Sequence, residues 1–219
     1  MKRDIDIKEI SDGKLYTAND MVKTDCHDCI GCSDCCRGMG SSIILDPMDI
    51  WRLTSNLQTD FNSLLDKYVE LGMVDGLIMP NLKLAGDGES CSFLTKEGRC
   101  GIHTFRPGIC RLFPLGRIYE ENGFKYFLQV HECAKTDKTK IKVKKWLGIS
   151  DIKSYEKFVW DWHEFVNKCE DALVELEGEQ QKVLTLFLLK TFYQTNYPAN
   201  DFYEEFYQRL NKAKEMFGF

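Results

Sequence analysis

Five cysteines lie within eleven residues near the start of the chain, and this run constrains the fold more than any other feature. The stretch at residues 25–40 reads DCHDCIGCSDCCRGMG and holds Cys26, Cys29, Cys32, Cys35 and Cys36. A packed core favours large branched side chains, whereas these thiols lie among Asp, Gly, Ser and His. The two-residue spacing lets the chain turn so that neighbouring sulfurs reach one cation. We therefore interpret the run as half of a metal site.

Four later cysteines are expected to supply the other half. Cys91, Cys100 and Cys110 lie within twenty residues, and Cys133 follows a segment with alternating apolar residues at 117–130. Disulfides are the competing interpretation. It is disfavoured because adjacent cysteines, as at residues 35 and 36, bridge each other only with strain.

Composition bounds the kind of protein. A chain of 219 residues with 43% hydrophobic residues is long enough for one domain, or one domain with a helical extension. The net charge of −5 disfavours nucleic acid as a partner. We expect no membrane partner, because the sequence lacks both an apolar run of about eighteen residues and the apolar core of a signal peptide. The expected location is cytoplasmic, where ten cysteines favour metal over disulfides.

The predicted fold class is α+β and predominantly α-helical. It combines a loop-rich cysteine module, with short strands and a β-hairpin, and a C-terminal helical part. We divide the chain into an N-terminal extension at 1–24 with no assigned function, a metal-binding module at 25–135, and a helical region at 136–219 packed on that module.

Several elements are predicted in the first half of the chain. A short buried strand is expected at 43–45, followed by a helix at 47–56 with Asp46 as its cap and Pro47 at its first position. A second helix should run over 61–71 and end at Gly72, before brief strands or loops at 73–88.

The second half is predicted as one hairpin followed by helices. The hairpin at 117–130 should turn at Asn122-Gly123 with type I′ geometry. Beyond Lys135 the pattern is interpreted as helical throughout. Its helices are expected at 152–176, 179–195 and 199–217, with Pro198 between the last two and Asn200-Asp201 as the cap.

The cysteine spacing and its neighbouring residues form a longer pattern. It comprises Cys29-x2-Cys32-x2-Cys35-Cys36, Asp46-Pro47-Met48-Asp49-Ile50, Cys91-x-Phe93-Leu94, Gly98-x-Cys100-x-Ile102-His103 and Arg106-Pro107-x2-Cys110-Arg111-x-Phe113-Pro114-Leu115. With these motifs, residues 26–135 resemble the bacterial and archaeal cysteine-cluster proteins of the YkgJ type, which are described as zinc- or iron-chelating domains.

The resemblance implies a set of ligands. Eight thiols match it, namely Cys29, Cys32, Cys35, Cys36, Cys91, Cys100, Cys110 and Cys133. Cys26 lies upstream of that pattern and is a ninth candidate. The family often has tyrosine at the position of His103, which argues against an obligatory ligand there, and His27 is a weaker candidate still.

Thiolate ligands select zinc or an iron–sulfur cluster over magnesium, calcium or manganese. The C-x2-C-x2-C run resembles ferredoxin spacing and favours a [4Fe–4S] cluster, although Cys36 directly after Cys35 departs from that spacing. Eight thiolates would make two four-ligand sites, or one cluster and one zinc with this adjacent pair divided between them. Arg37, Arg106 and Arg111 are candidates for offsetting the thiolate charge, with surface solubility as the alternative.

The leading functional interpretation is a metal-binding protein whose precise role and protein or small-molecule partner are unknown. One alternative is an enzyme or accessory protein in S-adenosylmethionine-dependent protein lysine N-methylation, because flagellin lysine methylases carry a similar cysteine-cluster domain. No adenosylmethionine motif is recognisable, however. A redox or metal-delivery protein is the other alternative. Cys169 and His163 lie in a helical pattern and are interpreted as packing residues.

Overall fold

The computed structural model describes residues 6–85, 89–198 and 201–219. The chain forms two compact units, and each is made of two separate stretches. The thiol unit comprises Lys2–Gly40 and Leu84–Glu156, and the helical unit comprises Ser41–Lys83 and Lys157–Phe219. All nine predicted ligand cysteines belong to the thiol unit. The units divide the chain at points other than 24/25 and 135/136, and those predicted boundaries stay a prediction.

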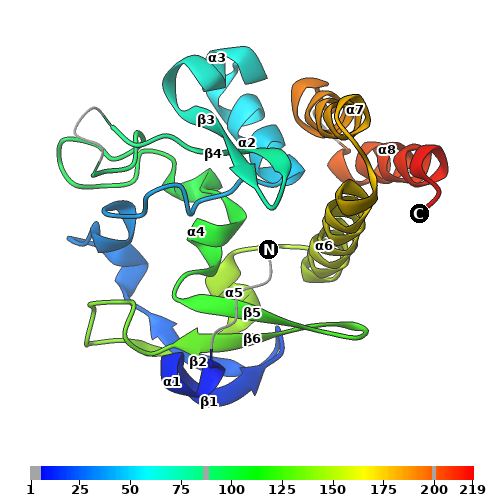
Figure 1. The fold of residues 1–219 in the computed structure, drawn as a ribbon. Coiled ribbons are helices and arrows are strands. Elements are labelled where there is room, and N and C mark those ends of the chain that lie inside the picture. The colour runs from blue at the N-terminus through cyan, green and yellow to red at the C-terminus, as the bar shows by residue number, and fades with distance from the viewer. Residues whose placement is uncertain (1–5, 86–88, 199–200) are drawn as a thin grey trace. The chain divides into compact units, whose positions relative to one another are not determined.

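The thiol unit is built on small antiparallel sheets (Figure 1). One sheet has the order β1-β6-β5 and the other pairs β2 with β7. The strands are β1 (Ser11–Tyr16), β2 (Met21–Asp25), β5 (Leu115–Glu120), β6 (Gly123–Gln129) and β7 (Thr139–Lys142). Short helical segments join them, namely α1 (Ile7–Ile10), η1 (His27–Cys29), η2 (Asp34–Cys36), η3 (His103–Phe105), α4 (Gly108–Leu112) and α5 (Val143–Leu147).

A small apolar core holds these strands and helices together. Its buried members are Val22, Leu112, Leu115, Tyr126, Val143 and Leu147. The core joins β2, α4, the β5–β6 hairpin and α5. It therefore fixes the backbone from which the cysteine-containing segments extend.

The predicted β5–β6 hairpin is confirmed, but its turn is not type I′. Glu120 pairs with Gly123, which places Glu121 and Asn122 in the turn. Type I′ needs a positive φ at both central residues. Of the described non-glycine residues, only His27, Cys29, Gln58 and Asp75 have positive φ, whereas Gly123 itself has φ 136°.

The sequence prediction missed the strands at both ends of the thiol unit. The described part of residues 1–24 contains β1 and most of β2, and β7 interrupts the region predicted as helical throughout. That prediction was wrong because β7 is specified by a distant partner: Ile141 pairs with Val22, while its neighbours are exposed. Four residues with one half-buried side chain carry little period-2 signal.

The helical unit contains helices and one hairpin. Its elements are α2 (Pro47–Leu57), α3 (Phe61–Lys67), β3 (Val69–Val74), β4 (Leu77–Leu82), α7 (Glu179–Leu188), the π-helical turn η4 (Leu189–Gln194) and α8 (Phe202–Phe217). The boundary between the units falls within α6 (Ile152–Glu175). The predicted strand at 43–45 is reduced to a single bridge between Ile44 and Asn81.

The start of α2 follows the prediction in detail. The Asp46 side chain accepts a hydrogen bond from Asp49 N at 2.8 Å, and Asp49 Oδ2 accepts one from Asp46 N at 3.2 Å. This reciprocal pair is a capping box, with Pro47 at the first helical position. The helix buries Ile50 and Leu53 as expected.

The predicted end of α3 was wrong. The helix ends at Lys67 instead of Leu71, and Gly72 lies inside β3 instead of terminating a helix. The strand forms because β3 finds a partner in β4 across a turn at Asp75 and Gly76, both with positive φ. β4 confirms a strand within 73–88, of which 86–88 lie outside the described residues.

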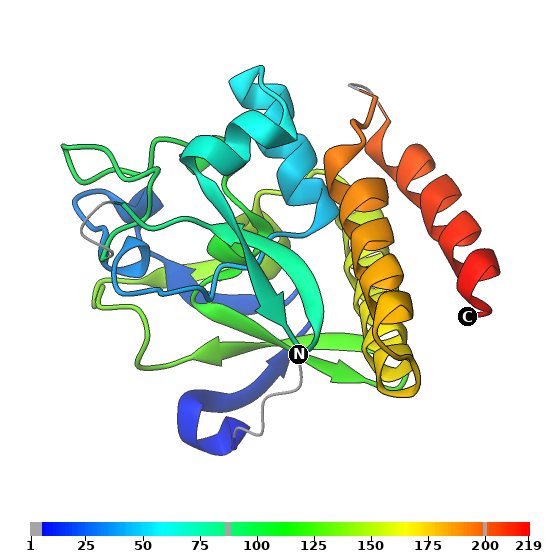
Figure 2. The ribbon, with the colours of Figure 1, turned by 45° about the horizontal axis from the view of Figure 1, so that its top comes forward.

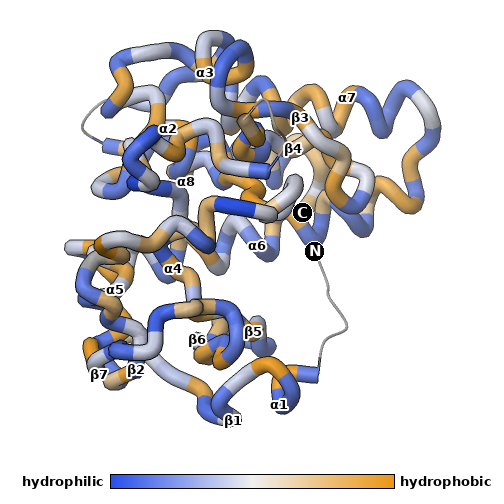
Figure 3. The backbone as a smooth tube through the Cα atoms, turned by 90° about the vertical axis from the view of Figure 1, so that its left-hand side faces the viewer, coloured by the Kyte–Doolittle hydropathy of each residue, from blue (hydrophilic) through white to orange (hydrophobic). Residues whose placement is uncertain are grey.

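The C-terminal helices confirm the prediction, and helix outweighs strand in this α+β protein. Hydrophobic residues recur between hydrophilic ones along α6 and α7 (Figure 3), as expected of helices with one buried face. In Figure 2, the parts of α6, α7 and α8 that belong to the helical unit lie side by side. Their core is aromatic: Phe158 and Phe206 lie 4.8 Å apart, and Trp162 and Phe192 lie 5.0 Å apart.

The start of α8 lies three residues later than predicted. Asp201 caps the helix and accepts a hydrogen bond from Glu204 N at 3.1 Å. The predicted start at Ala199 and the share of Asn200 in the cap lie outside the described residues. Within the described ranges, no helix is both long enough and apolar enough to cross a bilayer.

Candidate metal centre

Strand pairing brings the start of the cysteine run to the segment around Cys133. β2 ends at Asp25, directly before Cys26, and Asp25 pairs with Thr139 at the start of β7. Thr139 Oγ1 also donates a hydrogen bond to Asp25 Oδ2 at 3.3 Å. Lys135 Nζ donates to the carbonyl of Ile30 at 2.9 Å. Residues more than one hundred positions apart are therefore held together by backbone and side-chain bonds.

Cys26 and Cys29 are in contact within this region. Their Sγ atoms lie 3.5 Å apart, and Cys26 is 2% exposed. His27 and Cys29 both have left-handed backbone conformations, with φ near 55°. The chain therefore turns back sharply, and the amide of Cys32 donates to the carbonyl of Cys29 at 3.1 Å.

Cys133 lies within electrostatic range of the same turn. Burial raises the pKa of its thiol, and negative charge on Cys26 and Cys32 raises it further, while Lys138 opposes the rise. Lys138 Nζ donates to the carbonyl of Cys133 at 3.3 Å. Together these thiols form the first thiol group, which comprises Cys26, Cys29, Cys32 and Cys133.

Main-chain bonds assemble another set around the adjacent pair. The amide of Cys91 donates to the carbonyl of Cys36 at 2.8 Å, and Arg37 forms an antiparallel bridge with Ser90. Leu94 bridges Cys100, and its amide donates to the carbonyl of Cys91 at 2.9 Å, so one short loop carries both Cys91 and Cys100. We call Cys35, Cys36, Cys91 and Cys100 the second thiol group.

The thiols of the second group also perturb one another. A hydrogen bond from the Cys36 thiol lowers the pKa of Cys35, and the same bond raises the pKa of Cys36. Burial raises the pKa of Cys36 further, and so do the charges of Cys35, Cys91 and Cys100. Such mutual repulsion between thiolates is what a bound cation relieves.

Arg106 is the cation that acts on both groups. Burial raises the pKa of Cys29 and of Cys100, and the positive charge of Arg106 opposes both rises. Its guanidinium lies 6.0 Å from the centre of the Trp146 ring, and Nη1 lies 2.5 Å from His103 Nε2. Since arginine only donates, that nitrogen of His103 accepts the bond. His103 Nε2 is thus engaged by Arg106.

The other predicted cations lie differently. Arg111 is 8% exposed and donates to the carbonyls of Leu147 and Thr104 at 3.1 and 2.7 Å, so it holds the backbone of the unit together. Arg37 Nε donates to Ser33 Oγ at 3.4 Å within the cysteine loop. No sequence pattern indicated a role for Lys135 and Lys138, whose ammonium groups donate to carbonyls of the loops that carry the thiols.

The remaining candidate ligands, His27 and Cys110, lie in different surroundings. His27 is exposed, and its Nε2 lies 3.8 Å from Asp137 Oδ2. Cys110 lies on α4 and is half-buried, and it stays a predicted ligand.

Cys169 lies on α6 in the helical unit and is fully buried, which confirms a packing residue, and burial raises its pKa to about 12. His163 Nε2 lies 3.0 Å from Asn167 Nδ2.

The donor set fits a thiolate-bound metal. All ten cysteines lie in described ranges, and none is in a disulfide. Across residues 6–85, 89–198 and 201–219, however, no three His, Cys, Asp or Glu side chains already surround a point that suits an ion. The backbone therefore gathers the thiols, and their side chains must rotate to close on a metal.

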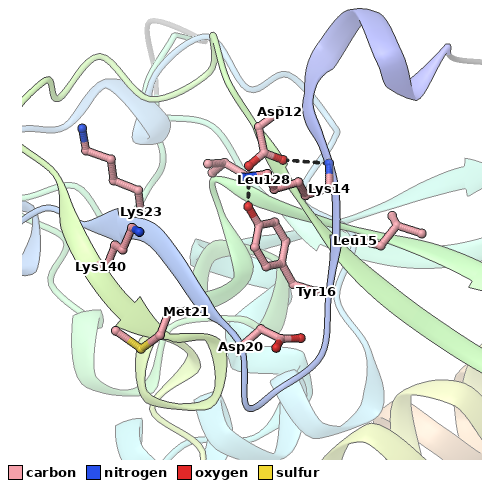
Figure 4. Close-up of a pocket in the computed structure, with 9 residues that line it drawn as sticks. All are labelled: Asp12, Lys14, Leu15, Tyr16, Asp20, Met21, Lys23, Leu128 and Lys140. Carbon is pink, nitrogen blue, oxygen red and sulfur yellow. Dashed lines mark hydrogen bonds between the residues drawn. The ribbon is translucent and has the colours of Figure 1, made fainter.

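A separate hollow of about 560 Å³ lies in the same unit, beside β1, β2 and β7 (Figure 4). Lys23 and Lys140 are paired across β2 and β7 on one side, and Asp12 accepts a hydrogen bond from the Tyr16 hydroxyl on the other. Burial and the hydrogen bond to Asp12 raise the pKa of Tyr16. The lining mixes both charges and does not select one class of ligand.

Comparison with known proteins bears on the thiols. Residues 28–145, more than half of the chain, match the model of the CxxCxxCC family, which is described as "Putative zinc- or iron-chelating domain". The chain belongs to the CxxCxxCC family. The matched range includes eight of the nine predicted ligands and begins two residues after Cys26. No curated protein and no solved structure matches the chain.

Proposed function

We propose that this CxxCxxCC protein binds zinc, an iron–sulfur cluster, or both on its clustered thiolates. The observation that carries the proposal is the convergence of thiols from residues 26–36, 91–100 and 133 through backbone pairing in one unit. Deprotonating these clustered thiols costs free energy in the absence of a cation, because burial and mutual repulsion disfavour their charged forms. A cation reverses that cost.

The role we favour for the metal is to hold the cysteine loops in place. The loops around η1 and η2 contain little buried apolar surface, since most of their residues are half-buried or exposed. A metal bound only in the folded state contributes its binding free energy to folding. The protein would then present a rigid surface to a protein or small-molecule partner.

A redox or metal-delivery role is the second candidate. It is favoured by the partial exposure of every predicted ligand except Cys26, because an exchangeable or redox-active site needs access. A part in S-adenosylmethionine-dependent lysine methylation would follow only if a cluster were found together with adenosylmethionine binding.

The deciding experiment is metal analysis of protein purified without oxygen. Iron, zinc and acid-labile sulfide are counted per chain, and an absorbance spectrum is recorded. Zinc alone supports the structural role, whereas iron with sulfide and reversible bleaching by dithionite supports the redox role. Protein that folds with neither metal, and takes up neither on reconstitution, overturns the proposal.

Matched substitutions locate the metal. Cys35→Ser and Cys36→Ser should each lower the metal content and destabilise the fold, because each removes a ligand from the second thiol group. Cys169→Ser is the control and should leave the content unchanged, since Cys169 is buried in the helical unit. Equal loss in all three variants would show that metal content follows folding and does not report ligation.

A further inference from the structure

We propose that Cys26, Cys29, Cys32 and Cys133 form a mononuclear zinc site of their own, separate from the second thiol group. The inference rests on the proposed function and assigns a ligand, Cys26, that lies outside the matched family range. It also divides the thiols between two sites, a choice that the cysteine spacing leaves open.

The distance between the first two sulfurs fits one zinc ion. Zinc–sulfur bonds of about 2.3 Å at tetrahedral angles place two ligand sulfurs about 3.8 Å apart. The Sγ atoms of Cys26 and Cys29 are 3.5 Å apart, close to that value and well beyond disulfide length. In a [4Fe–4S] cluster each cysteine binds a different iron atom, so its sulfurs stand further apart.

Burial of Cys26 gives a second argument. Its side chain is 2% exposed although it lies in a turn with charged and polar neighbours, whereas the other predicted ligands are half-buried. Burial alone also fits a packing cysteine such as Cys169, but Cys26 is buried in contact with another thiol, that of Cys29. A buried thiol with a fixed position is suited to be the first ligand, toward which the other three side chains turn to complete a metal site.

Cys133 completes the set from the segment that precedes β7. The antiparallel pairing of β2 with β7 brings the two segments together. Asp25, directly before Cys26, pairs with Thr139, which follows Cys133 by six residues. Lys135 bound to the carbonyl of Ile30 holds the segment over the turn between Cys29 and Cys32. The proposed site requires the Cys32 and Cys133 side chains to rotate toward the Cys26–Cys29 pair.

Charge explains why two sites can lie near each other. Two four-thiolate zinc sites carry a net charge of about −2 each and repel one another. Arg106 acts on Cys29 of the first thiol group and on Cys35 and Cys100 of the second. Lys138 adds a further positive charge at Cys133. These cations offset the repulsion.

Zinc X-ray absorption of wild-type protein and Cys26→His tests the ligand. Histidine still binds zinc, so the variant retains a donor. We expect unchanged zinc content and replacement of one sulfur by nitrogen at about 2.0–2.1 Å in the averaged shell. An unchanged all-sulfur shell in folded Cys26→His overturns the assignment of Cys26.

Double substitution tests the separation. Cys133→Ser should lose one metal site and Cys91→Ser the other, and the double variant should lose both, with Cys169→Ser as the control. Cys26→Ser/Cys133→Ser should lose no more metal than Cys133→Ser alone. Equal loss in Cys91→Ser, Cys133→Ser and their combination would mean one shared site and overturn the division, while wild-type protein that binds no metal would instead overturn the proposed function.

Discussion

Two arginines five residues apart show how similar side chains take different tasks. Arg106 and Arg111 flank Cys110 in one motif, and the sequence marks both as partners of the thiolates. Arg111 is buried and bonded to carbonyls of Thr104 and Leu147. Arg106 carries its charge toward the thiols of both groups. The cysteines were predictable because thiols at this spacing have few other uses, but the roles of the arginines depend on backbone that only the fold supplies.

Arg106→Gln should weaken metal binding by about tenfold, because removing an outer-shell partner of metal ligands typically costs 10–100-fold. Without its charge the thiols are harder to deprotonate, and deprotonation precedes binding. The measurement is competition with a coloured zinc chelator at neutral pH. Lys153→Gln removes an equal charge from α6 and should not change affinity. Equal affinities of Arg106→Gln and wild type would contradict the role.

At the scale of elements, local signals worked where they were complete. The capping box at Asp46 and Asp49 and the long apolar faces of α6 to α8 were sufficient for prediction. β3 and β7 were missed because each depends on a partner strand, and a helical pattern through Leu71 outweighed the hairpin turn at Asp75 and Gly76.

Gly116→Ala should destabilise the thiol unit by about 1–3 kcal/mol, the usual cost of overpacking. A methyl group at Gly116 in β5 would overlap the ring of Phe127, its partner on β6. Urea unfolding measures the change. Glu120→Ala, an exposed position on the same strand, is the control. A variant as stable as wild type would show that the Phe127 ring moves aside without cost.

Arg209→Met should destabilise the helical unit by about 2–4 kcal/mol, since hydrogen bonds to a charged group contribute about 1.5–3 kcal/mol each and do not add fully. Arg209 on α8 is 8% exposed and donates to the carbonyls of Thr191, Thr195 and Asn196 at 2.7–2.8 Å. These groups end the π-helical turn η4. Thermal unfolding measures the loss.

Two comparisons test that explanation. Lys212→Met removes an exposed charge from the same helix and should change stability little. Arg209→Lys keeps the charge but offers one nitrogen, whereas the guanidinium uses two for the carbonyls and a third for Glu205, so lysine should recover only part of the loss. Full recovery by lysine would mean that charge alone, and not the fork of donors, stabilises η4.

At the scale of the whole molecule, the thiol unit and the helical unit have different sources of stability. The helical unit has a core of aromatic rings, whereas the thiol unit has a small apolar core beside its cysteine loops. The α+β class was predictable from helical periodicity and the hairpin. The composition of each unit from two stretches was not, since pairing between distant segments leaves no local pattern.

Removing the metal should therefore open the thiol unit selectively. With a chelator present, the amides of Gly38 and Cys91, which close the second thiol group, should exchange faster with deuterated solvent, while amides in α7 and α8 keep their protection. Hydrogen exchange read by mass spectrometry gives the comparison. Uniform loss across both units, or no loss at all, would contradict a metal that stabilises the thiol unit.

The division of each unit into two stretches sets the order in which the protein can form on the ribosome. Every predicted ligand has emerged once residue 133 is exposed, and the thiol unit is complete at Glu156. Ser41–Lys83 must wait for Lys157–Phe219 before the helical unit can close. A nascent chain could thus capture its metal while its first helices still lack their partners, and the apolar surface of those helices would remain accessible to chaperones until Lys157–Phe219 emerges.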